Sequence, residues 1–333
     1  MTKISLLSLS LCLLFACTTS SKTEHQDTIH TEIAQLPAIK NKQIKDKQYI
    51  VVLGIAQDAG YPQAGCTKKC CANVWQHPEN KKSVVSLGIV DQVADKKWMV
   101  EATPDFKEQM QILNNYLPSA SMIPNGIFLT HGHIGHYTGL IHLGREVMGA
   151  QNVPVFTMPR MQTFLTNNGP WSQLVKLQNI KLTPIQADST FSISTNIKVT
   201  PLQVPHRDEF TETVGYKITG SAKTVLFIPD IDKWNKWEVD LKSLLKEIDI
   251  ALLDGSFYKN GEIPNRDMSQ IPHPFVEESM SLLQDLSASE KAKVHFIHFN
   301  HTNPLIQEKS PEYQEVLKKG YKIAKEGQII GLN

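Results

Sequence analysis

The segment FLTHGHIGHYTGL, residues 128–140, constrains the fold of this chain more than any other stretch. Three histidines stand within six positions, directly after an apolar run that predicts a buried strand. His131 and His133 can converge on one ion, whereas His136 is offset and can face a neighbouring ion. Glycines between them let the backbone turn so that the rings can meet. Because neutral imidazole is a good ligand for zinc, iron and related metals, the segment predicts a metal site where a strand ends at a sheet edge.

The rest of the chain predicts many strands with interleaved helices, without a strict βαβ rhythm. Short apolar runs such as 49–54 predict strands, and the alternation of apolar and polar residues over 180–204 predicts antiparallel strands. Helical spacing predicts helices over 139–148 and 313–324. With 333 residues, of which 41% are hydrophobic, the chain can bury a large core. We therefore expect an α/β fold with two mixed sheets packed face to face under outer helices, in one domain over 49–333.

The first residues read as an export signal. A lysine at position 3, a short apolar run and the sequence Leu14-Phe15-Ala16-Cys17 resemble a bacterial lipoprotein signal, which implies cleavage after residue 16 and a lipid on Cys17. The run is too short to span a bilayer, and an ordinary secretory signal is the alternative. Residues 17–48 are polar and predict a flexible tether. We expect an exported lipoprotein that faces the periplasm or the cell surface.

The balance of charged residues in the chain argues against one class of binding partner, nucleic acids. The 34 basic and 33 acidic residues are interspersed and leave a formal net charge of +1. A chain without a large basic field is not expected to bind nucleic acid in general. The expected partners are a small-molecule substrate and, through the lipid, a membrane.

The histidine segment resembles the signature H-x-H-x-D-H of the metallo-β-lactamase superfamily. The three histidines are in register, but Gly135 stands where the aspartate belongs. The resemblance implies an αββα sandwich, in which further site residues follow strand ends in a fixed order. Four residues of this chain match those positions: Glu101, which would support the loop, and the metal-binding His206, Asp230 and His298.

Within the superfamily, residues 50–332 look most like the PQQ-biosynthesis B protein family. The resemblance rests on LGIAQDAGYPQAGC, EATPDFKEQM, LLDGSFY, IHFNHTNP and the closing GYKIAKEGQIIGL. That family lacks the first two histidines of the loop and keeps the aspartate, and PQQ assembly is expected in the cytoplasm. Features of the cyclic phosphodiesterase of phosphonate breakdown are also present.

Three cysteines lie close together in GCTKKCCAN: Cys66, Cys70 and Cys71. Three cysteines cannot all pair, so one disulfide with a free thiol is one interpretation and a structural zinc site is the other. The phosphodiesterase relative has a cysteine cluster at this place and a histidine three residues after the last active-site histidine. This resemblance implies that His301 is the fourth ligand, and His77 is the alternative.

The resemblance also implies a mechanism in which metal-bound water attacks an ester or amide centre. His131, His133 and His206 would hold one metal, and His136, Asp230 and His298 a second, with Asp230 shared. Asp58 is our candidate to replace the missing aspartate, and His273 is a candidate general acid or substrate contact. We predict a hydrolase of a phosphodiester, ester or lactone that uses one or two ions of Zn, Mn or Fe. The alternatives are an iron- and oxygen-dependent oxidoreductase linked to PQQ or related quinones, and a non-catalytic binding lipoprotein.

Overall fold

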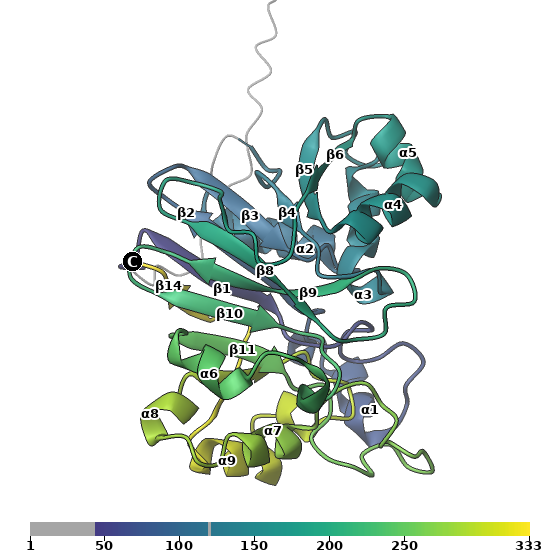
Figure 1. Cartoon of the computed structure of the whole chain (residues 1–333). Helices are drawn as coiled ribbons and strands as arrows, with labels where there is room; N and C mark the ends of the chain where they lie inside the picture. Colours follow the sequence, from purple (N-terminus) through teal and green to yellow (C-terminus); the bar gives the residue numbers. More distant parts are fainter. Residues whose placement is uncertain (1–43, 119–120) are drawn as a thin grey trace, which may run out of the picture. The chain divides into compact units, whose positions relative to one another are not determined.

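The computed structural model describes residues 44–118 and 121–333 (Figure 1). The predicted signal peptide, the lipidated Cys17 and most of the predicted tether lie outside these residues. Strand β1 begins at Gln48 and Ile44 packs against the core, so the described domain includes the last residues of the predicted tether. No helix within the described residues is both long and apolar enough to cross a membrane.

The described strands form two mixed sheets of seven strands each, in the orders β14-β1-β2-β3-β4-β5-β6 and β13-β12-β11-β10-β9-β8-β7. In each sheet one half pairs antiparallel and the other half, β3 to β6 or β10 to β13, pairs parallel. The first sheet contains β1 (Gln48–Gly54), β2 (Ser86–Asp91), β3 (Lys96–Val100), β4 (Ile127–Phe128), β5 (Val153–Thr157), β6 (Ile180–Pro184) and β14 (Ile329–Gly331). The second contains β7 (Phe191–Ser192), β8 (Lys198–Val204), β9 (Thr213–Thr219), β10 (Thr224–Ile228), β11 (Ile250–Asp254), β12 (Val294–Ile297) and β13 (Lys322–Ile323).

Strand β1 shows why the sheets are covered on both faces. All seven of its residues are buried, and successive side chains point to opposite sides. Ile50 and Val52 belong to the core that also contains Val214 and Tyr216 of the second sheet. The side chains in between pack instead in a second core with Leu113 of helix α2. A strand that is buried at every position, and apolar after its first residue, therefore specifies a layer between another sheet and a helix.

Helices lie on the outer faces of both sheets, as Figure 1 shows for α4 and α5 beside β6 and for α6 beside β11. The α-helices are α1 (Lys69–Gln76), α2 (Phe106–Tyr116), α3 (Ile134–Tyr137), α4 (Pro159–Asn167), α5 (Trp171–Lys176), α6 (Leu241–Lys246), α7 (Val276–Leu282), α8 (Ala288–Lys291) and α9 (Pro311–Lys318). Short 3₁₀ helices are η1 (Pro78–Asn80), η2 (Thr138–Leu143), η3 (Trp234–Lys236) and η4 (Pro304–Ile306). This αββα order of layers confirms the predicted fold class.

Three predicted elements differ from the structure. The expected helix over 139–148 is the shorter η2, because Gly144 is extended and Gly149 has a φ of 55°. Within 180–204, β6 pairs parallel with β5, and only β7 and β8 form the expected antiparallel pair. The expected helix over 313–324 ends at Lys318, because Gly320 has a φ of 92°, and the chain continues as β13.

Candidate metal centre

The predicted site residues lie just after the carboxyl ends of strands. The histidine loop follows β4, His206 follows β8, Asp230 follows β10 and His298 follows β12 directly. Parallel strands bring their carboxyl ends to one sheet edge, and two packed sheets bring two such edges together. Residues that are up to 167 positions apart, from His131 to His298, therefore meet because of the topology.

The first cluster contains three imidazoles, from His131, His133 and His206. One nitrogen from each ring lies within 4.8 Å of the others. Nε2 of His131 and Nδ1 of His133 are 2.8 Å apart. Burial lowers the pKa of all three rings, to about 4 for His206, so they are neutral at pH 7. Three neutral imidazoles whose nitrogens converge are a ligand set for zinc, iron or manganese.

The second cluster contains His136, Asp230, His298 and Asp58, the residue that we proposed as a replacement carboxylate. Oδ1 of Asp58 lies 3.0 Å from Nε2 of His136 and 3.6 Å from Nε2 of His298. Nε2 of His298 is buried and has no hydrogen-bond partner among the described residues. A buried nitrogen that faces two carboxylates without a hydrogen bond fits a ligand of a cation.

Gly135 and Asp58 compete for the same space. A Cβ atom at position 135 would lie 2.5 Å from Cα and 2.6 Å from Oδ1 of Asp58, which is closer than non-bonded carbon atoms approach. The glycine therefore allows the loop after β1 to lie against the histidine loop. Because the two loops lie so close together, the carboxylate of Asp58 reaches the second cluster from the loop after β1.

Asp230 lies between the two clusters. Its Oδ2 is 2.9 Å from Nε2 of His136 and 3.3 Å from Nε2 of His298, while its Oδ1 is 3.7 Å from Nε2 of His206. Burial raises the pKa of this carboxyl, but the neighbouring histidines outweigh burial and hold the pKa well below its usual range. Oδ2 is also 3.6 Å from Nε2 of His131 in the first cluster, so this ionised carboxylate contacts imidazoles of both clusters and could serve ions held by either.

The second nitrogen of several of these rings has a polar neighbour. Nδ1 of His131 lies 2.9 Å from the Thr130 hydroxyl, and Nε2 of His133 lies 3.3 Å from the Glu209 carboxylate. Nδ1 of His298 is 2.8 Å from the hydroxyl of Ser256. Such neighbours fix the ring and leave the opposite nitrogen for a metal. Sequence reasoning missed all three, since a polar residue beside a metal ligand has no pattern of its own.

The second cluster also favours positive charge. Burial lowers the pKa of His136, but Glu101, Asp230 and Asp58 outweigh burial and raise that pKa well above its usual value. Glu101 is fully buried with one oxygen 3.6 Å from Nδ1 of His136, where the sequence places a supporting acid. An environment that stabilises a proton on His136 stabilises a metal cation for the same electrostatic reason.

Two buried site residues have a strained backbone. Glu101 and His298 have φ values of 80° and 67°, which residues other than glycine rarely adopt. Both follow directly on a strand, β3 or β12, and the left-handed conformation turns the chain at the site. Strain of this kind costs about 1–3 kcal/mol and persists where the surrounding structure imposes it, which is common at functional sites.

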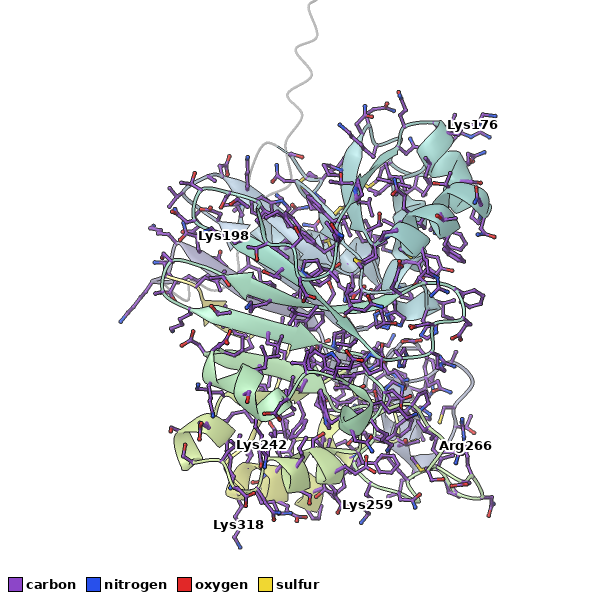
Figure 2. The ribbon with its side chains drawn as sticks, in the orientation of Figure 1. Lys176, Lys198, Lys242, Lys259, Arg266 and Lys318 are labelled. Atoms are coloured by element: carbon purple, nitrogen blue, oxygen red, sulfur yellow. The ribbon has the colours of Figure 1, made fainter. Side chains whose placement is uncertain are left out.

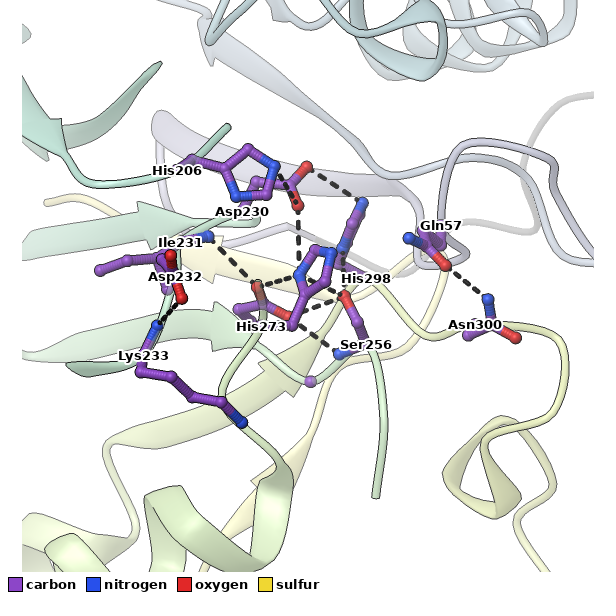
Figure 3. A network of polar contacts seen from close by, with 12 residues as sticks. Gln57, His206, Asp230, Ile231, Asp232, Lys233, Ser256, His273, His298 and Asn300 are labelled. Carbon is purple, nitrogen blue, oxygen red and sulfur yellow. Dashed lines mark hydrogen bonds and ion pairs between the residues drawn. The ribbon is translucent and has the colours of Figure 1, made fainter. Parts of the chain in front are cut away.

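His273 joins the site through a hydrogen-bonded network that Figure 3 shows. Its Nδ1 is 2.8 Å from Oδ2 of Asp254 and 3.4 Å from Oδ1 of Asp230. The other oxygen of Asp254 accepts hydrogen bonds from the backbone N–H and the hydroxyl of Ser256. Asp230, Asp254, His273 and His298 also have ligand atoms within 4.8 Å of one another, but the hydrogen bonds to both oxygens of Asp254 favour a role in orienting His273. Asp254 was missed as a site residue, although its motif LLDGSFY begins in the apolar strand β11 and places the aspartate at the end of that strand.

The cysteine cluster forms a separate group with His301. Sγ of Cys66 and Cys70 are 3.8 Å apart, and Sγ of Cys71 is 3.3 Å from Nδ1 of His301. The three cysteines carry no disulfide. A tetrahedral zinc ion with bonds of about 2.3 Å to sulfur separates its sulfur ligands by about 3.8 Å, so these residues fit a structural zinc. His77 lies outside the cluster and contacts Glu79 at the surface.

Comparisons with known proteins agree with this fold and site. A family described as "Beta-lactamase superfamily domain" matches residues 97–296, more than half of the chain. The chain is 24% identical over 306 residues to "Coenzyme PQQ synthesis protein B" of Xanthomonas oryzae pv. oryzae, covering 85% of this chain and 99% of that protein.

Two solved structures show the same fold. Zn²⁺-bound PqqB from Methylobacterium extorquens has a TM-score of 0.72 and 22% identity over 85% of this chain and 100% of that one. A diphosphatase from the PhnP family has a TM-score of 0.60 and 20% identity over 85% and 96% of the two chains. With the family match, the two seven-stranded sheets and the homology with PQQ synthesis protein B over 85% of its length, the chain belongs to the metallo-β-lactamase superfamily.

Proposed function

We propose that this protein is a metal-dependent hydrolase that cleaves a small phosphodiester, with carboxylic esters and lactones as further candidate substrates. The observation that carries the proposal is the pair of ligand clusters that share Asp230 beside a cavity lined by His273. The superfamily and the buried, converging ligand atoms support a metal cofactor. The diphosphatase of the same fold is consistent with phosphoester chemistry.

The ligand assignment follows the two clusters. His131, His133 and His206 would hold one ion, and Asp58, His136, Asp230 and His298 a second, with Asp230 between them. Divalent ions in such a site polarise a phosphoryl or carbonyl oxygen and make water a better nucleophile near neutral pH. The carboxylates of Asp58 and Asp230 also balance the positive charge.

His273 would supply the proton that the leaving group needs. In phosphodiester hydrolysis, water adds to phosphorus, the P–O bond to the leaving group breaks, and the leaving oxygen takes up a proton. Nδ1–H of His273 donates to Asp254, which leaves Nε2 as the nitrogen that can carry the transferred proton. The proton released by the attacking water then restores the protonated ring. Asp254 is a positioning residue, because it acts through His273.

Metal analysis tests the assignment. His131→Ala is expected to lower the bound metal by about one ion per chain and to slow hydrolysis of a p-nitrophenyl phosphodiester at least about 100-fold, because the first cluster loses a ligand. Metal content by mass spectrometry and the release of p-nitrophenol are the readouts, on protein loaded in turn with Zn, Mn and Fe. Unchanged metal content, or full activity after removal of metal by a chelator, would contradict the proposal.

Leaving groups test the role of His273. A general acid contributes about 10²- to 10⁴-fold when the leaving oxygen is basic and little when it is already stable as an anion. His273→Ala is therefore expected to slow cleavage of an alkyl diester at least about 100-fold, but that of the p-nitrophenyl diester only a few-fold. Equal losses on both substrates would assign His273 a structural role instead.

The homology with PQQ synthesis protein B favours a second candidate function, an iron- and oxygen-dependent oxidoreductase linked to PQQ or related quinone metabolism. Iron in the purified protein together with oxygen consumption supports this candidate. Zinc or manganese with diester hydrolysis supports the hydrolase.

A further inference from the structure

A cavity of about 600 Å³ adjoins the metal centre. His273 lines it, and so do Gln57 and Arg207, which precede Asp58 and follow His206 in the sequence. The ring of His273 lies 5.3 Å from that of His206, centroid to centroid. A cavity of this size next to the proposed reacting atoms is large enough for a small organic substrate.

The wall of this cavity is strongly cationic. It carries four basic side chains and one acid, Lys68, Lys69, Arg207, Arg266 and Glu262, and Cys70 and His301 of the cysteine cluster line it as well. Burial outweighs the hydrogen bonds to Glu262 and raises the pKa of this carboxyl to about 7, so it is only partly ionised at neutral pH. Since the whole chain has a net charge of only +1, positive charge is concentrated here.

The two cavity arginines differ from the other arginines of the chain. The sequence contains four, and two of them are engaged elsewhere: Arg145 pairs with Glu146 at 3.1 Å, and Arg160 donates to the Asp208 carbonyl at 2.6 Å. Arg207 and Arg266 make no side-chain hydrogen bond or ion pair across residues 44–118 and 121–333. Figure 2 labels Arg266 on the loop between β11 and α7. Arg207 interacts electrostatically with Glu209 but is not hydrogen-bonded to it, so both guanidinium groups keep donors that are available for a ligand.

We propose that this cavity binds a second anionic group of the substrate, a phosphate or carboxylate that is separate from the bond that is cleaved. This inference rests on the proposed hydrolase function. A guanidinium matches the geometry of both anions and can donate two parallel hydrogen bonds to either. Arg207 and Arg266 come from different loops, and Lys68 and Lys69 at the start of α1 add charge. The substrate class is then a small ester or diester with an anionic tail.

A matched series of p-nitrophenyl phosphodiesters tests this inference on the metal-loaded full-length protein. The second ester group is propyl as the neutral reference, or carboxypropyl or phosphonooxypropyl, which carry a carboxylate or a phosphate tail. Ethyl and butyl versions vary the length of the spacer between the diester and the tail. Calorimetry gives Kd for each compound, and the release of p-nitrophenol gives kcat/KM. An anionic tail is expected to improve affinity at least about tenfold over the neutral ester, because charged hydrogen bonds form only with the tail. Comparing the two anions shows whether phosphate or carboxylate is preferred.

Substitutions of the cavity arginines test whether these residues cause the preference for the anionic tail. The double variant with Arg207→Ala and Arg266→Ala is expected to lose most of the preference for the anionic tail, and Arg266→Ala alone part of it. Arg145→Ala, on the surface, is expected to keep it. The inference is overturned if the wild-type protein shows no preference at any spacer length, or if the double variant keeps it. If no diester is cleaved, the proposed function fails, while the ratio of Kd values still decides whether the anion site exists.

Discussion

Asp58→Ala is expected to remove about one metal ion per chain and to slow hydrolysis at least about 100-fold. The carboxylate is the closest acid to Nε2 of His136 besides Asp230, and it faces the unpartnered Nε2 of His298. Without it, the second cluster loses one of its four ligands and one of the two carboxylates that would balance the charge of an ion, so the ion is expected to be held much more weakly. Metal content and the rate of diester hydrolysis measure the two effects.

A matched control separates this effect from a general change in charge. Asp285→Ala removes an exposed carboxylate whose nearest cation, Lys242, is 3.5 Å away, and it is expected to change neither metal content nor rate. Asp58→Asn keeps the shape of the side chain and is expected to bind metal weakly. If Asp58→Ala retains the metal-to-protein ratio of the wild-type protein, Asp58 is not a ligand and serves only to shape the loop.

Cys71→Ser is expected to remove one zinc ion and to lower the free energy of unfolding by several kcal/mol. Cys71 is fully buried, so the serine hydroxyl, a weaker ligand than a thiolate, cannot be replaced by water without opening the site. Structural zinc contributes directly to folding stability, by about 10–16 kcal/mol in small zinc-binding peptides. Denaturant unfolding measures the loss, and metal analysis counts the zinc.

The same experiment distinguishes zinc from a disulfide. A protein with one disulfide and one free thiol would contain no zinc at the cysteines, and its stability would fall on reduction rather than on chelation. Mass spectrometry of the unreduced protein detects the disulfide. Zinc in the wild-type protein that persists in Cys71→Ser would contradict the assignment of Cys71. The metal of the two histidine clusters is expected to stay, which makes the cysteine cluster a separate site.

The sequence predicted which residues the fold brings together in the candidate site better than it predicted the elements around them. The resemblance to the superfamily, together with a polar residue after an apolar strand at each position, is what singled out His206, Asp230 and His298. The pairing direction of β6 has no such pattern, because it depends on which sheet the strand joins. The length of η2 depends on the extended backbone of Gly144, which the helical spacing of its neighbours hides.

Residues that act through another residue were the hardest to predict. Glu209 was missed because its role depends on a distance of 3.3 Å to His133, and sequence spacing carries no information on that distance. Asp254 could have been found, since it is the last residue of the buried strand β11 and lies at the same end of its strand as Asp230, which stands two residues beyond β10. The role of Asp254 could not be predicted from the sequence, because it depends on His273, which reaches Asp254 from a separate loop.

The contact between Gly135 and Asp58 has a consequence for the evolution of this site. Because a Cβ at position 135 would lie 2.5 Å from Cα of Asp58, an aspartate cannot return to the histidine motif by a single substitution while the loop after β1 keeps its place. The two positions are expected to covary among homologues, with glycine at 135 accompanying an acid at 58 and aspartate at 135 accompanying a small residue there. A search for H-x-H-x-D-H alone would therefore overlook members of the superfamily that keep the carboxylate but carry it on another loop.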